Sequence, residues 1–183
     1  MKCLRSTQND VLRLDAGNGV HNVEWSMDFT FGVHPDFKSH VGGTMKFKEG
    51  HGSVTNISAK QKLDTESSTA AELVGVDHAQ PLALCAPSFL KEQGHNVQEN
   101  IVKQDNESAT LLAKNGKTSL GKQTQAINVR CLHIADQIKR RNMSVEYCPT
   151  DDMTSDYMSE GPQGVKFQKF QHRIMGFSGE EPR

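Results

Sequence analysis

The sequence predicts a mixed α/β domain in which helices pack on a five-stranded mixed sheet. Three features lead to this prediction. Residues 23–33 alternate between apolar and polar side chains, two more strand-like segments follow, and strands then alternate with helical segments. The expected order of elements is β-β-β-α-β-α-α-β-α. The chain has 183 residues, enough for one domain with a substantial core.

The first three strands are expected to be antiparallel neighbours. Alternation with a period of two residues indicates a strand over residues 23–33, with these apolar side chains on one face: Val23, Trp25, Met27, Phe29, Phe31 and Val33. A loop leads to a second strand at residues 41–47, and a hairpin turn leads to a third at residues 53–59. Asp28 lies on the other face of the first strand, where an aspartate is unfavourable and calls for a reason.

The first helix is predicted to start at the serine and threonine residues that precede Glu72. Glu72 has two interpretations: its carboxylate completes a capping box with Thr69, or it belongs to a cluster that holds metal ions. The helix is expected to run towards Gly94. Because Pro81 and Pro87 each remove a backbone donor, at a cost of about 3 kcal/mol inside a helix, we expect a kink or an early break near Pro81.

The second half of the chain is expected to continue with strands and helices. A strand over residues 100–105 ends at Asp105, a helix over residues 106–115 follows it, and a further strand covers residues 143–147. Between them lies a longer helix, residues 124–141, whose buried stripe consists of Ile127, Cys131, Ile134 and Ile138.

The chain is expected to end with a helix and an extension. The helix begins beyond Pro149 and includes Asp156. Apolar residues then recur near helical spacing, at Phe167, Phe170, Ile174 and Phe177. We therefore divide the chain into a linker or strand remnant at residues 1–22, a domain at residues 23–160, and a C-terminal extension with a polar tail at residues 161–183.

Charge is distributed unevenly along the chain. The net charge is −1, so the overall charge does not indicate a nucleic-acid-binding protein. Residues 111–145, however, contain a single acidic residue, Asp136, and these basic residues: Lys114, Lys117, Lys122, Arg130, Lys139, Arg140 and Arg141. This segment is either a solvated helix face with a polar loop or a surface that contacts phosphates.

The cysteines and the hydropathy indicate the compartment. The 4 cysteines are scattered without a CxxC pair and are expected to be free thiols in a reducing compartment. The spacing of the histidines does not match a zinc site. The sequence has no signal peptide and no apolar run long enough to span a membrane, so we expect an intracellular protein without a membrane partner.

Four carboxylates stand at the ends or in the middle of predicted elements: Asp28, Glu72, Asp105 and Asp156. Side chains at such positions can converge at one end of a sheet. Oxygen ligands suit Mg²⁺ or Mn²⁺ and not zinc. Two such ions can clamp the attacking and leaving oxygens of a phosphoryl displacement, and they would offset the repulsion between the carboxylates.

At these residues the chain resembles the ribonuclease H domain at the end of the Pol polyprotein of Copia-type LTR retrotransposons. The resemblance covers about residues 4–176. It rests on these segments: Asp28-Phe29-Thr30-Phe31-Gly32-Val33-His34-Pro35-Asp36, Lys60-Gln61-Lys62, Ser67-Ser68-Thr69, Ala71-Glu72-Leu73, Gln104-Asp105-Asn106, Tyr147-Cys148-Pro149-Thr150-Asp151-Asp152-Met153 and Ser155-Asp156.

The resemblance implies an RNase H-like fold and two-metal cleavage of the RNA strand of an RNA–DNA hybrid, which leaves a 3′-hydroxyl and a 5′-phosphate. Asp28 would bridge two Mg²⁺ ions, Mn²⁺ being possible. Asp156 would hold the ion that activates water, and Glu72 and Asp105 the ion on the leaving-group side. The basic segment would contact the hybrid backbone. In an intact element the partner would be the reverse transcriptase of the same polyprotein. Residues 4–7 look like the end of the connection from that reverse transcriptase.

Several positions differ from the usual family pattern. Residues 123–127 and 159–164 lack basic residues common in the family, Ala70 stands where an acid is common, and Pro81 and Pro87 interrupt a helix. No metal ligand is lost. Two alternatives to an active nuclease therefore stay open. One is a degenerate, non-catalytic retrotransposon remnant that folds and at most binds nucleic acid. The other is an interaction domain whose carboxylates are surface caps.

Overall fold

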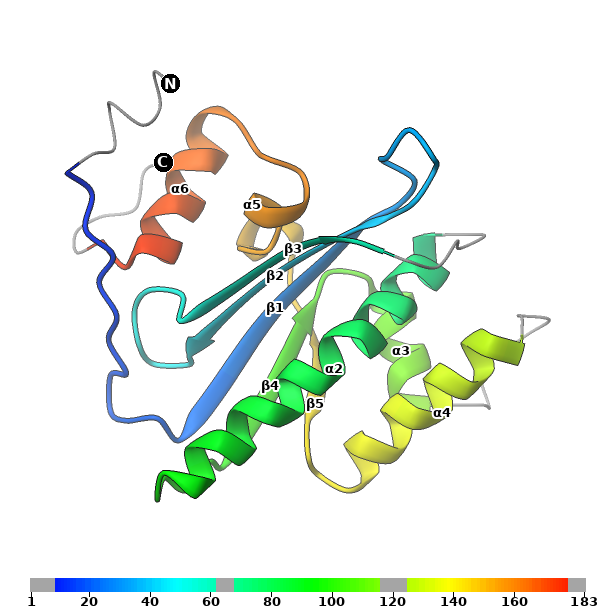
Figure 1. Cartoon of the computed structure of the whole chain (residues 1–183), viewed down its shortest axis with the longest axis horizontal. Helices are drawn as coiled ribbons and strands as arrows, with labels where there is room; N and C mark the ends of the chain where they lie inside the picture. The colour runs from blue at the N-terminus through cyan, green and yellow to red at the C-terminus, as the bar shows by residue number, and fades with distance from the viewer. Residues whose placement is uncertain (1–8, 62–67, 116–124, 178–183) are drawn as a thin grey trace.

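The computed structural model describes residues 9–61, 68–115 and 125–177. A five-stranded sheet forms its centre, in the strand order β3-β2-β1-β4-β5. The elements are β1 (Asn22–Thr30), β2 (His40–Phe47), β3 (Thr55–Lys60), α2 (Ser68–Glu92), β4 (Glu99–Gln104), α3 (Glu107–Asn115), α4 (Gln125–Lys139), β5 (Ser144–Tyr147), η2 (Thr150–Asp152), α5 (Asp156–Ser159) and α6 (Gly164–Met175). Helices α2, α3 and α4 cover one face of the sheet, and α5 and α6 lie on the other (Figure 1). This confirms the predicted mixed sheet and α/β class.

The strand register explains why the sheet is mixed. β1 pairs antiparallel with β2, and Asp28 lies opposite Gly42. β2 pairs antiparallel with β3, whereas β1 and β4 are parallel, as are β4 and β5. A parallel neighbour requires a crossover, and α2 supplies the crossover between the first three strands and β4. The ends of β1 and β4 therefore point to the same edge of the sheet.

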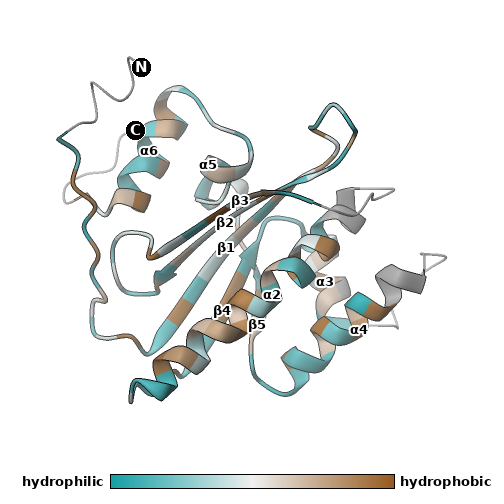
Figure 2. Ribbon diagram, viewed as in Figure 1, coloured by the Kyte–Doolittle hydropathy of each residue, from teal (hydrophilic) through white to brown (hydrophobic). Residues whose placement is uncertain are grey.

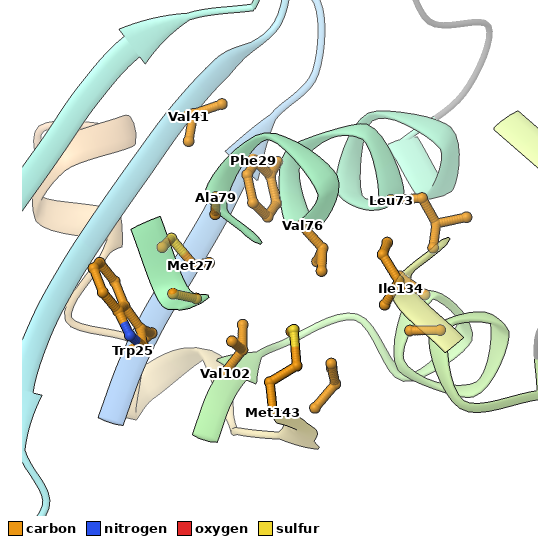
Figure 3. Packing of buried hydrophobic residues seen from close by; sticks show 14 of the residues in the cluster. Trp25, Met27, Phe29, Val41, Leu73, Val76, Ala79, Val102, Ile134 and Met143 are labelled. Carbon is orange, nitrogen blue, oxygen red and sulfur yellow. The ribbon is translucent and has the colours of Figure 1, made fainter. Parts of the chain in front are cut away.

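The core lies between the sheet and α2. Trp25, Met27 and Phe29 of β1 project towards this helix, which contributes Val76 and Ala79 (Figure 3). Hydrophobic and hydrophilic residues alternate along β1, as the sequence predicted (Figure 2). The second face of β1 is nevertheless buried too, because α5 packs over it. Asp28 is therefore only 6 % exposed.

Strand β1 is shorter than the alternation predicted. It ends at Thr30, although the apolar pattern continues to Val33. Gly32 turns the chain with a φ of +63°, and its N–H donates to Oγ of Ser39. Phe31 and Val33 consequently lie exposed in the loop between β1 and β2.

Helix α2 does not break at Pro81, so the prediction of an early end there is wrong. It continues to Glu92 with Pro81 and Pro87 inside it. Pro81 lies on the exposed side of the helix. Pro87 leaves the carbonyl of Ala83 without its helical donor, and Nδ2 of Asn100 donates to that carbonyl at 2.8 Å. The neighbouring strand therefore compensates for the missing backbone donor.

Beyond Pro149 the single helix predicted to include Asp156 is replaced by two short elements, η2 and α5, while α6 covers most of the later stretch whose apolar residues recur near helical spacing. The N-terminal segment runs beside α6: the N–H of Arg13 donates to the carbonyl of Met175 at 2.9 Å. Asp15 and His51 exchange two backbone hydrogen bonds, and the N–H of Ser53 donates to Ile174. Residues 10–15 are thereby held against both α6 and the turn after β2. Among the described residues, no helix is long and apolar enough to cross a membrane.

Candidate active site

Three of the four predicted carboxylates meet at one edge of the sheet. Asp28 is near the end of β1, Glu72 lies in the first turns of α2, and Asp105 directly follows β4. One carboxylate oxygen of each lies within 4.8 Å of the others. Asp28 and Glu72 are buried, and Asp105 is partly exposed. The parallel pairing of β1 with β4 causes this convergence, because it places both strand ends at the start of α2.

A glycine lets α5 approach this edge. Gly42 lies opposite Asp28, and a Cβ atom on it would come within 2.7 Å of the backbone nitrogen of Ser159. With hydrogen at that position, α5 packs directly on β2, and Oγ of Ser159 donates to Oδ2 of Asp28. The backbone of α5 is thus close enough to fix the carboxylate of Asp28 through a side-chain hydroxyl.

Glu72 is bound by a buried amide. Nε2 of Gln104, the last residue of β4, donates to Oε2 of Glu72 at 2.6 Å. Gln104 is fully buried, and its Oε1 atom has no partner among the described residues. The carboxylate of Glu72 therefore points to the end of β4. This orientation agrees with the cluster interpretation, whereas the side chain of Thr69, on which the capping box depends, lies outside what the structure describes.

The electrostatics of the cluster favour protonation. Burial raises the pKa of Glu72 to about 8, and the charges of Asp28 and Asp105 add to this effect against the hydrogen bond from Gln104. Burial also raises the pKa of Asp28, although the Ser159 hydroxyl opposes the shift. When they are ionised, carboxylates this close to one another repel unless a proton or a cation lies between them.

Asp156 lies outside the group of three. It is the first residue of α5 and is only 1 % exposed. Nζ of Lys166, from α6, donates to its Oδ2 at 2.6 Å. Burial raises the pKa of Asp156 to about 6, against the Lys166 hydrogen bond, and the nearby charge of Asp28 adds to it. Asp156 is thus close enough to interact electrostatically with the cluster, while its carboxylate is paired with a lysine.

Three residues of this site were not assigned a role from the sequence: Gln104, Ser159 and Lys166. Gln104 could have been predicted from the sequence, because it is a polar residue at the end of an apolar strand, directly before Asp105. Ser159 and Lys166 could not be predicted in this way. Their contacts depend on how α5 and α6 return to the sheet, and Lys166 lies 10 residues after Asp156 in another helix.

The basic residues predicted to contact phosphates are spread over different environments. Arg130 forms an ion pair with Asp77 of α2, and Nε of Arg140 lies 2.9 Å from Oδ2 of Asp136. Lys114, Lys139 and Arg141 are exposed, and Lys117 and Lys122 lie outside the described residues. The end of α4 leads into the start of β5, whereas the carboxylates lie beyond the end of β4. The basic residues at positions 139–141 and the cluster are therefore at opposite ends of the sheet.

A cavity of about 790 Å³ lies on the α6 side of the sheet, and none of the four carboxylates lines it. Its buried acid, Glu24, has basic partners on the sheet: Nζ of Lys103 lies 2.8 Å and Nζ of Lys46 3.5 Å from its carboxylate oxygens. Glu24 is thus paired with two lysines. The cavity is therefore not where the acidic cluster would bind a substrate.

The donor set of the cluster fits a hard divalent cation. The three carboxylates offer oxygens at one point, and two buried oxygens nearby, Oε1 of Gln104 and Oδ1 of Asp156, have no partner among the described residues. Mg²⁺ and Mn²⁺ prefer such oxygen ligands. The residues present are therefore suitable to hold a metal ion.

The sequence matches no protein-family model and no curated protein. Solved structures share its fold. LC11-RNase H1, isolated from compost by a metagenomic approach, is similar with a TM-score of 0.56 and 14% identity over 77% of this chain and 94% of that chain. The same enzyme in complex with an RNA/DNA hybrid gives a TM-score of 0.54 at 14% identity, over 76% of this chain and 95% of that chain.

A viral polymerase contains a similar unit. The foamy viral protease-reverse transcriptase in complex with an RNA/DNA hybrid has a TM-score of 0.51 and 12% identity, over 78% of this chain and 20% of that chain. The chain thus spans about a fifth of that protein. At these identities the similarity defines the fold, which is RNase H-like as the sequence predicted.

Proposed function

We propose that this chain is a metal-dependent ribonuclease of the RNase H type, which hydrolyses the RNA strand of RNA–DNA hybrids. One observation carries the proposal: Asp28, Glu72 and Asp105, from separate elements, bring their carboxylates within 4.8 Å on an RNase H-like fold. Two of the similar structures contain an RNA/DNA hybrid. The proposed products are a 3′-hydroxyl and a 5′-phosphate.

The side chains of the site have distinct proposed roles. Asp28, Glu72 and Asp105 would hold the metal, and Asp156 would be the fourth ligand. Two Mg²⁺ or Mn²⁺ ions, when bound, would activate the attacking water and stabilise the leaving oxygen. Gln104 orients Glu72 by its 2.6 Å hydrogen bond. Burial of Asp28 and Glu72 lowers the local dielectric constant and would strengthen their interaction with a cation.

The surroundings of the site complete the proposal. From the basic segment predicted to contact the hybrid, we propose Lys114, Lys117 and Lys122 as the residues that would contact its backbone. The other predicted residues are less suited, because Arg130 is paired with Asp77 and residues 139–141 lie at the opposite end of the sheet from the cluster. We further propose that the chain derives from a Copia-type Pol polyprotein, with residues 23–160 as the nuclease domain downstream of a reverse transcriptase. The resemblance of the quoted segments supports this origin.

A second candidate is a folded domain that binds nucleic acid without cutting it. One observation favours it: Asp156, the proposed fourth ligand, is ion-paired with Lys166. In that state Oδ2 of Asp156 is bound to an ammonium group, which repels a cation at the same carboxylate.

A cleavage assay distinguishes the two candidates. The RNA strand of an RNA–DNA hybrid is end-labelled and incubated with the full chain and Mg²⁺ or Mn²⁺, with single-stranded RNA and duplex DNA as control substrates. The proposal expects cleavage of the hybrid alone, and loss of at least about 100-fold in rate with Asp28→Asn. Glu99→Gln is the matched control, because Glu99 is an exposed acid at the opposite end of the sheet, paired with Lys48 at 2.8 Å. Folded wild-type protein that never cuts would support the second candidate.

A further inference from the structure

Lys166 binds one carboxylate oxygen of Asp156, the proposed fourth metal ligand. Its Nζ atom lies 2.6 Å from Oδ2 of Asp156. The same atom lies 5.5 Å from the ring centroid of Phe170, which is fully buried. The ammonium group is therefore held between a buried carboxylate and a buried aromatic ring, and it is not a freely moving surface charge.

Asp156 has an unused oxygen beside this ion pair. Its Oδ1 atom is buried and has no hydrogen-bond partner among the described residues. The side chain of Asp156 is only 2% exposed, whereas that of Lys166 is 35% exposed. The lysine therefore reaches solvent, while the carboxylate is almost completely covered.

Helix α6 is fixed in place by contacts that do not involve Lys166. Phe170 and Ile174 are buried on the same helix. One turn after Lys166, Lys169 donates to the carbonyl of Asp151 at 2.8 Å and to Oδ1 of Asp152 at 3.3 Å. The ion pair with Asp156 can therefore open by movement of the Lys166 side chain, without displacement of α6.

We propose that Lys166 competes with a divalent cation for Asp156, so that the lysine must leave before Asp156 can act as a metal ligand. This inference rests on the proposed metal site. Asp28, Glu72 and Asp105 would bind an ion readily, and occupation of the position next to Asp156 would be controlled by Lys166. A positive charge 2.6 Å from the carboxylate oxygen repels a cation at the same oxygen.

Metal binding to the full chain without nucleic acid tests the competition. Mn²⁺ is titrated into metal-free protein by calorimetry, with wild type, Lys166→Met and Lys169→Met. The proposal expects Lys166→Met to bind the weaker Mn²⁺ ion about tenfold more tightly, as expected when a competing charge pair is removed. Lys169→Met is the matched control, since Lys169 belongs to the same helix and binds Asp152 instead. Equal binding by Lys166→Met and wild type would overturn the inference.

Two further measurements test the competition even if Lys166→Met does not fold. Lys166→Arg keeps the charge and should bind Mn²⁺ as wild type does. In wild-type protein, the Nζ resonance of Lys166 followed by NMR should shift during the second Mg²⁺ binding step, while that of Lys169 stays constant. An unchanged Lys166 resonance through that step would equally contradict the competition.

The outcomes for this inference and for the proposed function are separable. Hybrid cleavage by wild type together with unchanged Mn²⁺ binding in Lys166→Met would refute the competition and leave the nuclease. Absence of any Mn²⁺ binding that depends on Asp28 would refute the metal site itself. Hybrid cleavage that becomes faster at low Mg²⁺ in Lys166→Met would support both.

Discussion

Asn100 donates a 2.8 Å hydrogen bond to the carbonyl of Ala83, the acceptor that Pro87 leaves without a helical partner. Asn100 lies on β4, the strand that precedes Asp105, and Ala83 lies on α2, the helix that contains Glu72. A proline inside the helix is thus tolerated because the adjacent strand supplies a donor. Nδ2 of Asn100 also donates to the carbonyl of Asn142 at 3.0 Å. This bond connects the residues just before β5 to the same amide group.

Replacing Asn100 should cost less stability when Pro87 is also replaced. We expect Asn100→Leu to lower the free energy of unfolding by about 1–3 kcal/mol, because a buried carbonyl loses its partner. In a Pro87→Ala background the backbone N–H of residue 87 can bond Ala83, so the cost should be smaller. Urea unfolding of the four proteins in this cycle measures the coupling. Equal costs in both backgrounds would show that the hydrogen bond does not compensate for Pro87.

Adding a methyl group at Gly75 should destabilise the core. A Cβ atom at this position of α2 would overlap the ring of Phe29 on β1. We expect Gly75→Ala to lower the free energy of unfolding by about 1–3 kcal/mol through overpacking, although alanine favours helix by up to about 1 kcal/mol. Denaturant unfolding measures the change. Phe29→Leu combined with Gly75→Ala should show less than the sum of the two single effects; full additivity would argue against a clash.

Stability of the metal-free protein should fall as the pH rises from about 4.5 to about 8. Burial raises the pKa of Glu72 from 4.5 to about 8, so the folded state holds a proton that the unfolded chain releases in this range. This contribution is complete below pH 4.5 and lost above pH 8, with a slope of at most about 1.4 kcal/mol per pH unit. Asp156, with a pKa raised to about 6, acts in the same direction at lower pH.

Urea unfolding at several pH values, with a chelator present, measures this slope. Glu72→Gln is the matched variant, since a neutral amide cannot titrate and should flatten the profile. Mg²⁺ should reduce the slope, because a bound cation stabilises the ionised carboxylates. A wild-type stability that increases over the same pH range would contradict the assigned electrostatics.

Neutralising Lys114 should weaken hybrid binding more than neutralising Arg130. Lys114 is exposed at the end of α3, whereas Arg130 is already ion-paired with Asp77. If Lys114 contacts a phosphate, Lys114→Gln should reduce the slope of log K against log salt by about 1. Arg130→Gln should leave that slope unchanged and lower stability, because Asp77 loses its guanidinium partner and keeps only the His133 ring, 3.7 Å away. Binding of a fluorescent hybrid at several salt concentrations provides the comparison; a larger slope change for Arg130→Gln would reverse the assignment.

The sequence was most informative where periodicity decided the structure. The alternation around Trp25 and Met27 predicted β1, and the turn residues between the next strands predicted the antiparallel part of the sheet. Periodicity failed at Phe31, which continues the pattern into a loop, because Gly32 turns the chain. Propensity failed at Pro81, because the packing of a 25-residue helix outweighs the local cost of one proline on its exposed side.

The site was predictable only in part, for a related reason. Asp28, Glu72 and Asp105 occupy ends of regular elements, so topology alone brings them to one edge of the sheet. The surroundings of Asp156 depend on how α6 packs, and no pattern in the sequence specifies that Lys166 reaches it. Tertiary packing of short elements is therefore the information that the sequence patterns lacked.

The backbone of residues 10–15 is bonded both to α6, through Arg13 and Met175, and to the turn after β2, through Asp15 and His51. Removal of residues 10–15 would therefore leave the carbonyl groups of Met175 and His51 without these donors and would loosen the C-terminal end of α6, the helix that carries Lys166.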